Sequence, residues 1–208
     1  MGSVSRRFAV LTLDNLDDIG QPCRSCVFWE LDEVAGRRAV EGGDPELEKE
    51  AWVSATLLEW GSCGTIAYAG DAPAGYAIYA PPAFVPRSSM FPTSPISTDA
   101  IQLVTARVTP DLRGQGFGRA LVQAAARSLV RRGVKAIEAF GDARNDQPTC
   151  LLPADFLLSV GFKTVRQHPK RPRLRLELRT VITLTEEVEV ALDRIMDAVR
   201  PEPALRPA

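Results

Sequence analysis

Several features that would direct a chain of this size to a particular function are scarce or missing. The 208 residues include one histidine and four cysteines, and the formal net charge is −1. A charge this close to zero gives no general attraction to nucleic acid or to an acidic membrane, so we expect neither as a partner. No apolar run reaches the length of a transmembrane helix, and the N-terminus lacks the apolar segment of a secretory signal, so we expect a cytoplasmic protein.

The few cysteines are the next constraint. Without a secretory signal they do not predict a disulfide framework. Cys23 and Cys26 form a C-x-x-C pair, but a zinc site would need two more ligands and the single histidine is His168, so we expect no metal. Two interpretations of the pair stay open, namely reduced thiols packed in an N-terminal helix and a redox site.

What remains has the composition of a globular protein, with 45% hydrophobic and 25% charged residues. The length lies within the range of one domain and is enough for a sizeable core without metal or disulfide support. We expect one domain over residues 1–180, an appended helix over residues 181–200 and a disordered tail over residues 201–208.

One stretch organises the chain. Residues 101–108 are apolar or β-branched at most positions, which predicts a strand. After a glycine-rich turn the apolar residues recur at the spacing of a helix stripe, at Leu121, Val122, Ala125, Leu129 and Val130. Gly133 then ends that helix. The order is therefore strand, glycine turn, helix.

The turn has the composition of an anion site. Gly114, Gly116 and Gly118 carry no Cβ, so a ligand can approach the backbone closely. The first N–H groups of the following helix lack intrahelical partners and lie at the positive end of its dipole, and Arg113 and Arg119 add charge beside them. A phosphate or pyrophosphate fits such a site best. The alternative is a tight turn without a ligand, which needs neither the arginines nor three glycines.

Three known kinds of phosphate-binding turn require different residues, and only one of them fits this stretch. A P-loop requires Gly-Lys-Ser/Thr, which is missing, and a dinucleotide fingerprint requires a third glycine where Arg119 stands, although Glu138 mimics its ribose-binding acid. The run from Val108 to Gly118, Val-Thr-Pro-Asp-Leu-Arg-Gly-Gln-Gly-Phe-Gly, resembles the acyl-CoA signature of the GNAT superfamily of N-acetyltransferases. It matches the pattern Val-x-Pro-x-x-Arg-Gly-x-Gly-x-Gly at every fixed position.

The resemblance implies an α/β fold with a mixed, mostly antiparallel sheet and helices on both faces. The cofactor strand and the next parallel strand splay apart, and acetyl-CoA lies in the gap. The backbone of the cofactor strand would hold the acyl-pantetheine arm and the glycine turn the pyrophosphate. The implied cofactor-binding residues are Ala106, Arg107, Val108, Arg113, Gly114, Gln115, Gly116, Phe117, Gly118 and Arg119.

The catalytic positions depart from the family pattern. Counted back from Gly161-Phe162, the tyrosine that protonates the leaving thiolate in many members falls on Leu157, and the asparagine falls on Cys150. The place of a glutamate base in some members is Gln102, which cannot take a proton at neutral pH. The catalytic residues therefore stay unknown. Weak candidates for the acid or base are Asp99, Asp142, Tyr79 and Cys150, and His168 between prolines is weaker still.

The rest of the chain fits the same order of elements. Pro45 and Pro153 begin further helices. Strands are expected over residues 7–13, 65–68, 74–80, 135–140, 163–167 and 173–179, the last with one wet face of arginines. The proline-rich segment 81–99 reads as a long loop, which either covers the acceptor end of the cleft through Phe84, Met90 and Phe91 or makes a plain surface excursion. A helix over residues 185–200 either pairs with a second subunit, giving a homodimer, or packs on its own sheet.

The sequence thus predicts an enzyme that moves an acetyl group from acetyl-CoA, as co-substrate, to the primary amine of an unknown small-molecule or peptide acceptor. Two alternatives remain. One is a non-catalytic acyl-CoA-binding regulatory module, which the missing tyrosine and glutamate favour. The other is a thiol redox or metal protein that uses Cys23 and Cys26.

Overall fold

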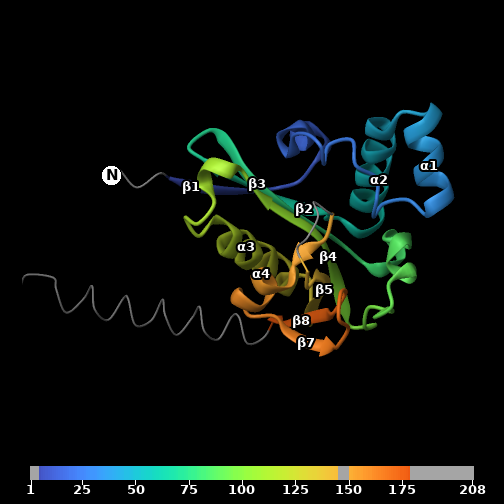
Figure 1. Ribbon diagram of the computed structural model, residues 1–208. Helices are drawn as coiled ribbons and strands as arrows, with labels where there is room; N and C mark the ends of the chain where they lie inside the picture. The colour runs from blue at the N-terminus through green and yellow to red at the C-terminus, as the bar shows by residue number, and fades with distance from the viewer. Residues whose placement is uncertain (1–4, 145–149, 179–208) are drawn as a thin grey trace, which may run out of the picture.

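A mixed β-sheet runs through the computed structural model, which describes residues 5–144 and 150–178 (Figure 1). Within these residues the strands are β1 (Arg6–Val10), β2 (Gly64–Ala69), β3 (Ala72–Ala80), β4 (Ala100–Val108), β5 (Ala136–Asp142), β6 (Leu152–Pro153), β7 (Lys163–Arg166) and β8 (Arg173–Glu177). They lie in the order β1-β2-β3-β4-β5-β8-β7, with β6 paired to β5. Only the β4–β5 and β5–β6 pairs are parallel, which confirms the expected mostly antiparallel sheet.

Helices cover both faces of this sheet, as the resemblance implied (Figure 1). One face carries η1 (Leu13–Ile19), α1 (Glu33–Gly42) and α2 (Pro45–Trp60), and the other carries α3 (Phe117–Arg131) and α4 (Ala154–Ser159). The period-2 pattern of β3 separates the two cores. Tyr76 packs with Trp52 on the α2 side, whereas Tyr79 packs with Leu129 on the α3 side, so the prediction that these tyrosines face opposite ways is confirmed.

The ends of the main helices follow local signals. The Asp44 carboxylate caps α2 by accepting hydrogen bonds from the N–H groups of Glu46 and Leu47, and Pro45 occupies the first turn. Gly61 ends α2 in the left-handed conformation, with a φ of 82°. Gly133, with a φ of 78°, follows α3 as its sequence predicted. These local preferences set where the helices begin and end, and the apolar faces of α2 and α3 then pack them against the sheet.

The proline-rich segment after β3 is more ordered than a plain loop. It forms two 3-10 helices, η2 (Pro82–Phe84) and η3 (Pro86–Met90). The ring of Phe91 stacks with Trp29, at 4.9 Å between centroids, and with Phe140, at 4.6 Å, and these two rings also stack with each other at 6.2 Å. Phe84 also packs against this core, whereas Met90 is 57% exposed. The segment therefore packs onto the α2 face of the sheet through Phe84 and Phe91 and not through Met90, and its expected place over the acceptor end of the cleft stays a prediction.

The arginines of β8 do not form the wet face that their alternation predicted. Arg173 and Arg175 donate to the carboxylate of Glu138, a fully buried residue of β5, at 2.8 and 3.1 Å. Arg175 also binds both oxygens of Asp99 at 2.9 Å. A buried carboxylate needs such partners, so the arginines serve a buried charge rather than solvent.

Some expectations concern residues outside the described ranges. The helix over residues 185–200 and the tail over residues 201–208 belong to this group. None of the helices in the described ranges combines the length and the apolar character that crossing a bilayer requires.

Candidate active site

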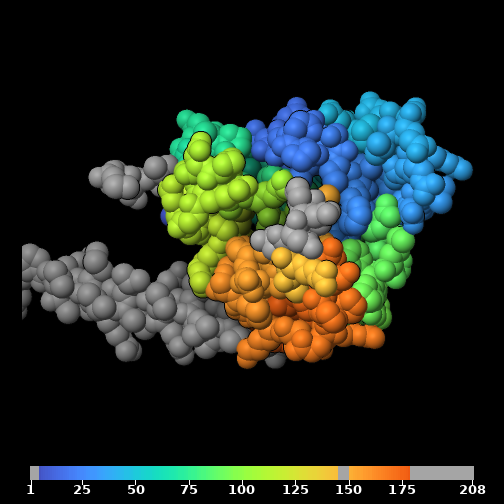
Figure 2. Space-filling model, viewed as in Figure 1, coloured from blue at the N-terminus to red at the C-terminus, as the bar shows by residue number. Residues whose placement is uncertain are grey.

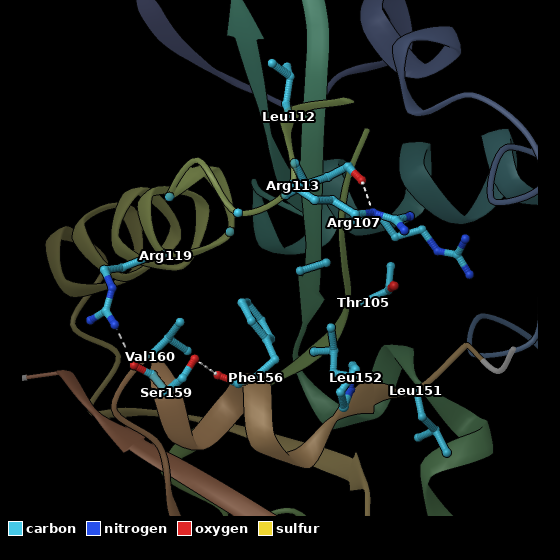
Figure 3. Close-up of a pocket in the computed structure, with 16 residues that line it drawn as sticks. Thr105, Arg107, Leu112, Arg113, Arg119, Leu151, Leu152, Phe156, Ser159 and Val160 are labelled. Atoms are coloured by element: carbon cyan, nitrogen blue, oxygen red, sulfur yellow. Dashed lines mark hydrogen bonds between the residues drawn. The ribbon is translucent and has the colours of Figure 1, made fainter. Parts of the chain in front are cut away.

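A cavity of about 710 Å³ opens where β4 and β5 separate (Figures 2 and 3). The two strands pair only over Ala100–Gln102 and Ala136–Glu138. Just beyond this pairing, the register between β3 and β4 skips Val104, which has no partner on β3. A bulge of this kind bends the strand and increases its twist. We infer that the bulge turns β4 away from β5 and creates the space between them.

Two walls from distant parts of the chain line the cavity (Figure 3). The first consists of the second half of β4, the turn after it and the beginning of α3. The second consists of β6 and α4, which lie opposite in orange in Figure 2. The lining residues are Thr105, Ala106, Arg107, Val108, Leu112, Arg113, Gly114, Gly116, Gly118, Arg119, Leu151, Leu152, Pro153, Phe156, Ser159 and Val160.

Each glycine of the turn has its own physical reason. Gly114 and Gly116 have φ angles of 74° and 83°, which L-residues with a side chain rarely adopt. Gly118 is helical, but a Cβ at this position would lie 2.9 Å from the ring of Phe156. The first two glycines therefore set the path of the turn, and the third lets α3 approach α4.

The charges around the turn are positive. The side chain of Arg113 is exposed and donates from Nε to the carbonyl of Val108 at 3.2 Å. Arg119 reaches across the cavity and donates to the carbonyl of Ser159 at 2.7 Å (Figure 3). Arg6 donates to the carbonyl of Gln115 at 2.7 Å. Within the described ranges none of these arginines has a carboxylate within ion-pair distance, so their charge is available to an anionic ligand.

The start of α3 is the other half of an anion site. Gly116 is its N-cap residue and has no side chain that could accept from the first N–H groups of the helix. The first turn of α3 contains no acidic residue either. A helix of this kind presents unpaired donors and a positive dipole end, which suits a phosphate.

Comparison with known proteins decides the family. The pattern described as "Acetyltransferase (GNAT) family" matches residues 18–150, which is more than half of the chain. The chain belongs to the GNAT acetyltransferase family. No curated protein sequence matches it.

Solved structures support the GNAT fold. The PaiA N-acetyltransferase from Thermoplasma acidophilum in complex with coenzyme A has a TM-score of 0.55 and 12% identity, covering 83% of this chain and 99% of that one. An N-acetyltransferase from Staphylococcus aureus Mu50 has a TM-score of 0.51 and 14% identity, and the match covers 84% of this chain and 99% of that one. The yncA protein from Salmonella typhimurium with its cofactor acetyl-CoA has a TM-score of 0.50 and 14% identity, and the match covers 83% of this chain and 94% of that one. At these identities the likeness shows the fold alone.

The GNAT signature and the cavity overlap closely. Of the ten residues that the resemblance assigned to the cofactor, all but Gln115 and Phe117 line the cavity. Phe117 is 2% exposed and packs with Ala67 and Leu121 in the core, so its side chain anchors the start of α3. Gln115 bonds through its side chain to the carbonyl of Asp111.

The opposite wall of the cavity was not predicted. Leu151, Leu152, Phe156, Ser159 and Val160 come from the segment before Gly161-Phe162. The sequence marked this segment as a helix with Pro153 near its start, but an apolar stripe does not by itself tell a cavity wall from a core face. The close approach of Phe156 to a glycine on α3 is a tertiary fact.

Three of the four catalytic candidates lie away from the cavity lining. Tyr79 is fully buried on the α3 side, where its hydroxyl contacts Ser62 at 3.1 Å. Asp99 is held by Arg175, whose hydrogen bonds keep the pKa of that carboxyl below its usual value. Asp142 is 3% exposed and accepts a bond from Arg171 at 2.6 Å. These residues have structural partners, and none of them is among the residues that line the cavity.

The positions of the usual GNAT acid and base are buried and do not titrate near neutral pH. Leu157 is fully buried in the core beneath α4. Gln102 is also fully buried, and its Oε1 accepts a hydrogen bond from Ser88, while its Nε2 has no partner in the described ranges. Neither side chain can carry a proton in the reaction.

The fourth candidate, Cys150, directly precedes the lining residue Leu151. Its sulfur lies 3.2 Å from the sulfur of Cys26. The hydrogen bond from Cys150 is the main cause that lowers the pKa of Cys26 to about 6. The same bond, together with burial, raises the pKa of Cys150. The contact therefore favours ionisation of Cys26 over ionisation of Cys150.

The C-x-x-C motif does not provide this contact. Cys23 is buried, and its thiol bonds to the hydroxyl of Tyr76 instead. No group of three or more metal-ligating side chains occurs in the described ranges. The partner of Cys26 comes from a position 124 residues away, and nothing in the motif predicts it.

Proposed function

We propose that this protein transfers the acetyl group of acetyl-CoA to a primary amine. The observation that carries the proposal is the cavity between β4 and β5, because one end of it is the uncapped start of α3 with Arg113 and Arg119 beside it. Its volume of about 710 Å³ is in the range of pockets that hold a ligand of this size class. The complexes of two fold neighbours with coenzyme A and with acetyl-CoA support the same ligand.

The residues present fit this co-substrate along its whole length. The glycine turn and the N–H groups of α3 would hold the diphosphate. The backbone of Ala106, Arg107 and Val108 would bind the amides of the pantetheine arm, since in the described ranges no strand pairs with that edge of β4. The apolar wall of Leu152 and Phe156 would cover the arm on the other side.

The chemistry proposed at this site is direct attack of the amine on the thioester carbonyl. Backbone N–H groups of β4 near the bulge at Val104 would stabilise the developing oxyanion. We assign the proton for the leaving thiolate to Cys150, because it directly precedes the lining residue Leu151 and the pKa of its thiol is raised, whereas Asp142, which pairs with the lining residue Pro153, is held in an ion pair by Arg171. The acceptor is a small-molecule or peptide amine.

The test combines binding with turnover. Purified protein with acetyl-CoA and a panel of primary amines is expected to give an acetylated amine, detected by mass spectrometry. Cys150→Ala is expected to lower kcat at least tenfold with an unchanged dissociation constant for acetyl-CoA. Asp99→Asn serves as the control, since Asp99 pairs with Arg175 away from the cavity, and should retain turnover. Tight binding without transfer to any amine would favour the regulatory module instead.

A further inference from the structure

Two thiols from distant parts of the chain meet beside the cavity. Cys26 lies in the segment before α1, and Cys150 lies two residues before the start of β6. Their sulfurs are 3.2 Å apart. A second contact joins the same two segments. The indole Nε1 of Trp29, three residues after Cys26, donates to the backbone carbonyl of Cys150 at 3.1 Å. The contact is therefore fixed by the fold around it and not only by the thiols.

The other two cysteines are unsuited to chemistry. Cys63 is fully buried, and burial raises the pKa of its thiol to about 12. Cys23 is 6% exposed and bonds to Tyr76. Cys26 and Cys150, in contrast, are only partly buried, so a small reagent can reach them. A partly ionised thiol beside a second, protonated one is the arrangement of an attacking and a resolving cysteine.

We propose that Cys26 and Cys150 form a reversible disulfide, by exchange with a low-molecular-weight disulfide, that ties the segment before α1 to the wall of the cavity. The thiolate of Cys26 attacks one sulfur of the small disulfide and expels the other as a thiolate. Cys150 then gives its proton to the first expelled thiolate and attacks the sulfur of Cys26, which expels the second thiolate, and this takes a proton from water. In total two protein thiols become one disulfide, and the small disulfide is reduced to two thiols.

The link has consequences for the whole fold. The sulfurs must close from 3.2 Å to about 2.05 Å, which draws the end of the cavity wall toward Cys26. The bond would close a loop of roughly 125 residues, and the loop-closure model then predicts an equilibrium constant for folding about 4,000-fold larger. Oxidation would also remove the thiol proton of Cys150, so turnover should fall at least tenfold. Only this last effect rests on the proposed function.

Peptide mapping of the full-length protein tests the link directly. Trypsin cuts after Arg24, so Cys23 and Cys26 fall in separate peptides, residues 8–24 and 25–37, and Cys150 falls in residues 145–163. After incubation with oxidised glutathione and blocking of free thiols, the expected product is peptide 25–37 joined to peptide 145–163. A reducing agent should release it. A link between peptides 8–24 and 25–37, or glutathione adducts without any protein disulfide, would overturn the proposal.

Variants and stability provide the control. Cys23→Ser should keep the link, whereas Cys26→Ser should lose it and retain at most a glutathione adduct on Cys150. The urea midpoint of the wild-type protein should rise on oxidation and return on reduction, and a midpoint that does not rise would contradict a link across the fold. Because the mapping needs no substrate, failure of the acetyl-transfer assay would leave this result intact, and a missing link would leave the transferase proposal intact.

Discussion

Replacing Arg113 with alanine tests the anion site at the end of β4. The side chain is exposed, and its one hydrogen bond in the described ranges goes to the carbonyl of Val108. It has no carboxylate partner there, so its removal should change the free energy of unfolding by less than about 0.5 kcal/mol. Any larger effect on acetyl-CoA affinity would then report a contact with the ligand.

The size of that effect follows from the exposure of the guanidinium. A hydrogen bond to a charged group contributes about 1.5–3 kcal/mol, and exposed ion pairs contribute about 0.2–1 kcal/mol because water screens them. Arg113 lies between these cases, beside a helix start that supplies donors of its own. We expect a loss of about 1–2 kcal/mol, which is roughly a 5- to 30-fold increase in the dissociation constant.

Isothermal titration of acetyl-CoA at low and at high salt measures this change. Arg127→Ala is the matched control, since Arg127 is an exposed arginine of α3 outside the cavity lining and its replacement removes the same charge. The Arg113→Ala effect should shrink at high salt, and the control should bind as wild type does. Equal affinities for the two variants would refute the placement of the phosphates at this turn.

Three further changes probe the frame of the site. Gly118→Ala gains about 1 kcal/mol of helix propensity but places a methyl group 2.9 Å from the ring of Phe156. Urea unfolding should therefore show a net loss of about 1 kcal/mol in the free energy of unfolding. A more stable variant would mean that the ring moves freely. Lys49→Ala leaves the buried carboxylate of Glu30 without its ion-pair partner and should cost about 3–5 kcal/mol by the same measurement, whereas a loss below about 1 kcal/mol would contradict the burial of this pair. Asp44→Ala removes the cap of α2 and should cost about 1 kcal/mol, and Asp44→Asn should recover most of it.

Local signals in the sequence were enough for much of the fold. Asp44 and Pro45 mark the start of α2, and the glycines after β4 mark a turn whose φ angles only glycine adopts readily. Such features depend on a few neighbouring residues, so a single sequence contains them in full. The glycine turn at one end of the cavity was predictable for the same reason, and its role in binding phosphate stays a prediction.

Contacts between distant segments were not predictable in this way. The alternating arginines of β8 indicated a wet face because the partner of Arg173, the buried Glu138, lies on another strand. The C-x-x-C spacing directed attention to Cys23, although Cys26 contacts Cys150. In both cases the sequence contains the two partners, but only the register of the sheet and the packing of loops bring them together.

Because β4 separates from β5, the sheet has an internal edge in addition to its two outer edges. Peptide groups along this edge pair with β3 on one side, and in the described ranges no strand pairs with them on the other. Because folding already fixes the alignment of these peptide groups, a ligand with amides at matching intervals can bind without a rearrangement of β4. This internal edge lies inside the cavity, opposite the wall formed by β6 and α4, which shields it from strand addition by neighbouring molecules.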